Sequence, residues 1–190
     1  MIEFDFSLLL YGFAVGLVAG ALGGVLAGLA GLGGGLIYVP LLYALMPGES
    51  DSIGLYVFAS LVAIVCTGFF SSRAHWRLGH IDFNALRLLL PGLMIGAGLG
   101  LWTTLHLPET LVLLALAGLN AWIAYDYGRK VQWLEANHRL LPILSGPIGY
   151  ISGTVGIGGG TMLVPLLRRL TELRFTVGTA ALCGMGMALA

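Results

Sequence analysis

The chain has 190 residues, of which 58% are hydrophobic and only 9% are charged. A typical soluble domain carries roughly 25% charged residues, so this chain lacks the polar surface that a soluble fold of its length needs. The formal net charge is zero, which excludes a basic field for binding nucleic acid. The composition therefore predicts an all-α protein that crosses a lipid bilayer several times.

Eight apolar runs mark the expected helices. In chain order they are 6–30, 35–46, 53–71, 85–105, 111–126, 140–155, 161–167 and 177–190. A full membrane span needs about 20 residues, and two of the runs, 35–46 and 161–167, fall well short of that length. We therefore expect each of these two to be the second arm of a hairpin, over residues 6–46 and 140–167, that returns to the face it entered from.

Basic and acidic residues occupy alternating polar segments between the apolar runs. The basic residues form three clusters: Arg73, Arg77 and Arg87; Arg129, Lys130 and Arg139; and Arg168, Arg169 and Arg174. The other breaks carry only acidic residues, namely Glu3, Asp5, Glu49, Asp51 and Glu109. The positive-inside rule then predicts cytoplasmic basic clusters and an N-terminus outside.

This sorting predicts the order of the units along the chain. Residues 1–127 form a first repeat of one hairpin (6–46) and three spans (53–71, 85–105 and 111–126). Residues 128–139 form a cytoplasmic linker. Residues 140–190 form a second, incomplete repeat with its own hairpin (140–167) and the start of a further span (177–190).

The two hairpins share a glycine-rich sequence, which reads GLAGLGGGLIYVPLL from Gly28 and GTVGIGGGTMLVPLL from Gly153. Because an odd number of predicted spans separates the copies, we expect an inverted repeat, a plan that recurs in secondary transporters. Three consecutive glycines favour a break in a helix. The short helix after such a break begins with unpaired N–H groups and the positive end of its dipole.

A helix start of this kind binds anions, so two of them that meet near the midplane predict one anion site. No Asp or Glu lies deep within a predicted span, which argues against a cation or proton site. The expected substrate-binding residues are Gly33, Gly34, Gly35, Ser60, Gly158, Gly159, Gly160 and Thr161, with Pro40 and Pro165 as structural parts of the motif. No catalytic pair, cofactor motif or metal-binding spacing is visible, so an enzyme is not expected.

Glycines in membrane helices also serve close packing between helices. We assign that role to the four-residue spacing of Gly12, Gly16, Gly20, Gly24 and Gly28. Packing alone does not require three glycines in a row. We therefore still assign the triple glycines, 33–35 and 158–160, to the anion site.

The duplicated motif G-x-GGG-x-x-x-x-P-L-L, together with AHWRLGHID at residues 74–82, resembles the TauE/SafE sulfite exporter (TSUP) family of membrane permeases. The resemblance covers nearly the whole chain. It implies a multi-pass protein of the bacterial inner membrane that moves a small sulfur-containing or organic anion. The mechanism we expect is alternating access around the site at the two glycine motifs. The protein's expected partners are the lipid bilayer and the anion, with no cofactor and no nucleic acid.

Counterparts of the AHWRLGHID loop and of the last two spans do not follow the second motif before Ala190. We expect the missing spans to belong to a longer protein, or to be supplied by a homo-oligomer or a second chain. Two further interpretations stay open. One is a channel-like anion facilitator, and the other is a membrane scaffold that transports nothing.

Overall fold

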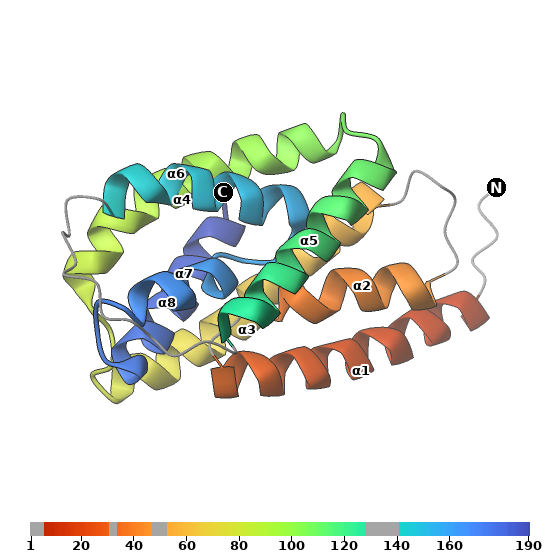
Figure 1. The fold of residues 1–190 in the computed structure, drawn as a ribbon. Coiled ribbons are helices and arrows are strands. Elements are labelled where there is room, and N and C mark those ends of the chain that lie inside the picture. The colour runs from red at the N-terminus through yellow and green to blue at the C-terminus, as the bar shows by residue number, and fades with distance from the viewer. Residues whose placement is uncertain (1–5, 31–33, 47–52, 128–140) are drawn as a thin grey trace.

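The computed structural model describes residues 6–30, 34–46, 53–127 and 141–190, and within them it contains eight α-helices and no strand. The helices are α1 (Phe6–Ala30), α2 (Gly35–Leu45), α3 (Ile53–Arg77), α4 (Phe83–Thr104), α5 (Glu109–Tyr127), α6 (Leu141–Val155), α7 (Gly160–Leu167) and α8 (Leu173–Ala188). The predicted all-α class is confirmed. Figure 1 shows α6 running alongside α4, and α1 running alongside α2.

The helix bounds follow the apolar runs closely, with the largest difference at α3. This helix continues six residues past the apolar run, from Ser71 to Arg77 (77 − 71), and Gly79 at φ 71° then turns the chain. The Asp82 side chain caps α4 by accepting from the N–H groups of Asn84 and Ala85 at 2.9 and 3.1 Å. The cap satisfies N–H groups that the first helical turn leaves unpaired, so α4 begins two residues before the apolar run.

The tightest helix contact is between α4 and α6, and it is made by glycine. A Cβ added to Gly96 or Gly100 of α4 would overlap the backbone of α6. A Cβ added to Gly149 or Gly153 of α6 would overlap the backbone of α4. Two helices that approach this closely through small residues gain van der Waals contact where lipid offers no hydrophobic driving force.

The glycines spaced four residues apart in α1 do not pack closely against another described helix, although we predicted that they would. A Cβ on Gly16, Gly20 or Gly24 would meet nothing within 4 Å among the described residues, and one on Gly12 would touch only Met46. Gly28 lies outside the part of the chain whose side chains are described. The expected close packing of this stripe is therefore not made within the described chain. Instead Gly23, which is off the stripe, packs against Tyr38 of α2.

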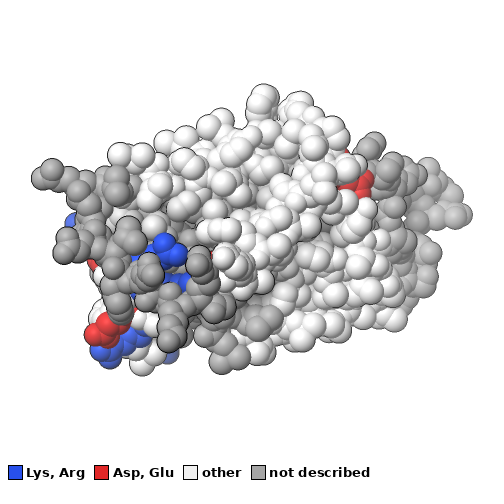
Figure 2. Space-filling model, in the orientation of Figure 1, with Lys and Arg blue, Asp and Glu red and all other residues white. Residues whose placement is uncertain are grey.

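Apolar helices and charged ends give the molecule the profile of a membrane protein. Within the described residues, α3 and α4 are long and apolar enough to cross a bilayer, while α2, α8 and Leu10–Val25, the part of α1 whose side chains are described, are shorter apolar segments. On the face seen in Figure 2, Lys and Arg gather at one end, and the described surface between the two ends is uncharged. The Lys and Arg residues seen on this face therefore share one end of the molecule, as the charge sorting predicts.

Candidate anion site at the glycine motifs

The second glycine motif breaks the chain between α6 and α7. The N–H of Ile157 donates to the carbonyl of Ser152 at 3.1 Å and closes the last turn of α6. Gly156 and Gly158 then take φ values of 70° and 76°, a region that residues with a side chain rarely adopt. Gly159 is back in the helical region at φ −58°, and α7 begins at Gly160. The motif thus needs its glycines for two turning positions as well as for close approach.

The first glycine motif lies directly against the second. A Cβ on Gly35, the first residue of α2, would overlap the backbone of Ile157 within the second break. The carbonyl of Gly34 starts α2 by accepting from the N–H groups of Ile37 and Tyr38 at 3.0 and 3.1 Å. Gly33 lies outside the described residues. The start of α2 therefore touches the break that precedes α7.

The start of α7 presents backbone donors. The first backbone bond of this helix joins the N–H of Leu163 to the carbonyl of Gly159 at 2.9 Å. No backbone carbonyl in the described parts of the chain accepts from the N–H groups of Gly159, Gly160 or Thr161. These N–H groups, at the positive end of the helix dipole, are the kind of donors that hold an anion.

Gly184 of α8 keeps the approach to these donors free of a side chain. A Cβ on Gly184 would stand 3.6 Å from the nitrogen of Gly160 and 3.8 Å from that of Gly159. A hydrogen-bonded acceptor would have to sit at roughly 2.9 Å from the same nitrogens, so a methyl group there would compete for its place. The sequence motif does not include Gly184, and its role depends on how α8 packs against α7.

The two predicted hydroxyl ligands are bonded within the protein. Ser60 of α3 is fully buried, and its hydroxyl donates to the carbonyl of Gly156 at 2.6 Å. The Thr161 hydroxyl donates to the carbonyl of Gly158 at 3.0 Å. Each hydroxyl has one hydrogen, so in this conformation both hold the break in shape and neither has a proton to offer an anion. Their part in substrate binding stays a prediction.

Apolar side chains surround the second break. A Cβ on Gly158 would touch Ile64, and one on Gly159 would touch Leu163 and Met187 at 3.4 and 3.5 Å. All three side chains belong to one buried cluster, which also includes Tyr38 of α2. Backbone donors in such an environment interact with an anion more strongly than they would in water.

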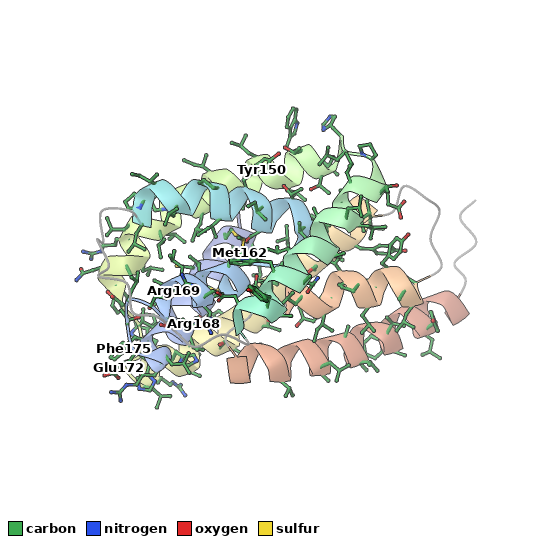
Figure 3. The ribbon with its side chains drawn as sticks, in the orientation of Figure 1. Tyr150, Met162, Arg168, Arg169, Glu172 and Phe175 are labelled. Carbon is green, nitrogen blue, oxygen red and sulfur yellow. The ribbon has the colours of Figure 1, made fainter. Side chains whose placement is uncertain are left out.

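An ion-paired cluster fixes the other end of α7. The carboxylate of Asp126, at the end of α5, accepts from Arg168 at 2.5 Å and from Arg169 at 2.9 Å. Arg168 also donates to the backbone carbonyl of Asp126 at 2.9 Å. Figure 3 shows both arginines at the end of α7. The sequence places Asp126 only at the end of a span and gives no sign of its partners.

No group of three or more His, Cys, Asp or Glu residues that could hold a metal ion lies within the described residues. At the second glycine motif, the described residues offer backbone N–H groups in an apolar surround.

Comparison with known proteins gives a family and three curated relatives. Residues 15–190 match the profile of the family described as Sulfite exporter TauE/SafE. A "Probable membrane transporter protein" of Haemophilus influenzae is 35% identical over 89% of this chain and 68% of its own length. Relatives with similar names occur in Methanocaldococcus jannaschii (27% identical, 87% of this chain, 64% of the relative) and Bacillus subtilis (29%, 82% and 68%). No solved structure matches the chain.

Proposed function

Because the chain belongs to the TauE/SafE sulfite exporter family of membrane transporters, we propose that it moves a small sulfur-containing or organic anion, such as sulfite or a sulfonate, across the bacterial inner membrane. In this proposal the chain crosses the membrane several times, with its basic end in the cytoplasm and its N-terminus outside. The anion binds between the two glycine motifs.

One observation carries the proposal, namely the contact between Gly35 and the backbone of Ile157. Gly35 and Ile157 lie more than a hundred positions apart in the sequence (157 − 35 = 122), yet the two copies of the motif touch. The N–H groups of Gly159, Gly160 and Thr161 lie beside that contact. One shared anion site requires the two copies of the motif to meet, with backbone N–H groups beside the contact that are not bonded to a described backbone carbonyl.

The mechanism we propose is alternating access, in which the two hairpins rock against each other about this contact. Gly156 and Gly158 supply backbone that can change direction. The anion is held by α7 donors in both orientations, and only the side of the molecule that is open to water changes. Among the described residues, the side chains nearest Gly158 and Gly159 are all apolar, so the anion meets no like charge from them.

The test is a flux assay with purified protein in proteoliposomes loaded with sulfite or methanesulfonate. Saturable flux supports the alternating-access permease. Flux that rises linearly with concentration supports the channel-like facilitator instead. No flux, together with no binding of either anion to the purified protein, would contradict the transport of these anions and leave the scaffold interpretation.

A further inference from the structure

The end of α3 carries a pocket whose described lining includes no residue of the glycine motifs. The pocket has a volume of about 290 Å³, and Arg73, Trp76 and Arg77 line it. Because Arg73 and Arg77 are four residues apart on a helix, their side chains are neighbours on its surface. The sequence groups Arg87 with these two arginines, but Arg87 is not part of the described lining.

The charges of Arg73 and Arg77 are not neutralised within the described structure. Both residues are exposed, and no described carboxylate pairs with either of them. The carboxylate nearest along the chain, that of Asp82, accepts from N–H groups at the start of α4. Like charges four residues apart on a helix repel each other, so an anion held between the two arginines would replace repulsion with attraction.

Aromatic side chains continue from this pocket along α3. Trp76 is exposed, and its ring packs edge-to-face with that of Phe83, with 6.4 Å between the centroids. Phe69 and Phe70 are exposed as well, and they precede Trp76 and Arg77 by seven residues each. Seven residues are about two helical turns, so the phenylalanines lie on the same side of α3 as the pocket, about 10 Å along its axis. One side of α3 thus changes from apolar to basic over the distance between acyl chains and headgroups, with a tryptophan at the boundary.

We propose that this pocket binds the headgroup of an anionic phospholipid, with Arg73 and Arg77 donating to the phosphate and Trp76 beside the glycerol. The acyl chains then lie against Phe69 and Phe70. A charged headgroup with an apolar tail matches the order of these side chains along α3, whereas free phosphate would use only the arginines. The inference requires the end of α3 to lie at the membrane surface, and it does not depend on which anion the protein transports.

The experiment measures lipid binding to the detergent-purified full chain by native mass spectrometry. Phosphatidylglycerol is the anionic lipid, and phosphatidylcholine is the neutral one. We expect the wild type to prefer phosphatidylglycerol. Arg73→Gln and Arg77→Gln should each weaken phosphatidylglycerol binding about fivefold, because each removes one charge beside the anionic headgroup. A wild type without this preference would overturn the proposal.

Arg87→Gln is the matched control. Arg87 is exposed and lies in the first turns of α4, just after the turn that follows α3, so its loss removes the same charge from the same region but not from the pocket. We expect this variant to bind phosphatidylglycerol as the wild type does. An equal loss in Arg87→Gln and Arg77→Gln would overturn the pocket, because it would show only a general attraction between basic side chains and anionic lipid. Displacement of the lipid by an equal concentration of inorganic phosphate would overturn the contribution of the acyl chains.

Discussion

Ser60 and Thr161 illustrate how a residue predicted as a ligand can hold a site in shape. Both hydroxyls donate to carbonyls of the second glycine break, those of Gly156 and Gly158. A break in a helix frees carbonyl groups, and in a membrane interior these carbonyls need donors from the protein. The two hydroxyls meet that need.

This role predicts the effect of Ser60→Ala. The variant leaves the Gly156 carbonyl without the donor that reaches it at 2.6 Å. We expect a loss of about 1–3 kcal/mol in the free energy of unfolding, measured by denaturation in detergent. Ser71→Ala, on the same helix but only partly buried, is the control and should change stability little. Unchanged stability in Ser60→Ala, with weaker anion binding, would favour Ser60 as a direct ligand.

At this scale the sequence identifies the glycine motifs but not all of their neighbours. The motifs can be found because they are duplicated, and duplication is visible without a structure. Gly184 cannot be found in this way, because α8 lies outside both copies of the motif. Its importance depends on how α8 packs against α7.

At the scale of helices, the contact between α4 and α6 predicts a sharp response to added side-chain volume. Gly149→Val should prevent these helices from reaching their observed separation, because even a Cβ at Gly149 overlaps the backbone of Leu93. We expect a strong loss of monodisperse protein in size-exclusion chromatography, since overpacking against backbone cannot be relieved by a side-chain rotation. Gly98→Ala on α4 is the control, because its Cβ would meet nothing within 4 Å. Equal yields of the two variants would contradict the packing described.

The contact between α4 and α6 also shows what the glycine spacing of α1 leaves open. A four-residue glycine spacing indicates a face that can pack closely, but it does not name the partner. In α4 and α6 the partner is present, and the backbones touch at Gly96 and Gly149. In α1, no described helix covers Gly16, Gly20 or Gly24.

The link between α5 and α7 gives a third prediction. Asp126→Asn removes the charge that two arginines share, and the side chains of Asp126 and Arg168 are only 10% and 12% exposed. Breaking a buried pair costs about 3–5 kcal/mol, so we expect a marked drop in the midpoint of thermal unfolding. Glu172→Gln is the control, because its pair with Arg174 is exposed and such pairs contribute about 0–1 kcal/mol. Similar small effects in both variants would show that the Asp126 cluster is not a structural link.

At the scale of the whole molecule, the basic end predicts the orientation in the membrane. In a chain with Cys66 and Cys183 replaced by alanine, a new cysteine is introduced at one of two exposed positions, Leu78→Cys or Thr110→Cys. A membrane-impermeant maleimide should label Thr110→Cys in intact cells and Leu78→Cys only after permeabilisation. The reverse pattern would place the N-terminus inside.

The order and approximate bounds of the helices could be predicted because lipid as solvent demands long apolar runs, and polar breaks are then easy to see. The extension of α3 to Arg77 could not be predicted from hydropathy, because polar residues beyond an apolar run form helix as readily as loop. The inverted relation of the two repeats stays a prediction. Gly33 and the linker 128–139 lie outside the described residues.

The central claim is that an anion binds at the start of α7, and Gly184→Ala tests it most directly. The added methyl group fits without displacing its neighbours, since it stands 3.6 Å from the nitrogen of Gly160, but it occupies the space from which an anion would reach that N–H. Titration of purified protein with sulfite should give a clearly weaker affinity for Gly184→Ala than for the wild type and the Gly98→Ala control, with all three proteins equally folded. Equal affinities in the three proteins would contradict the site.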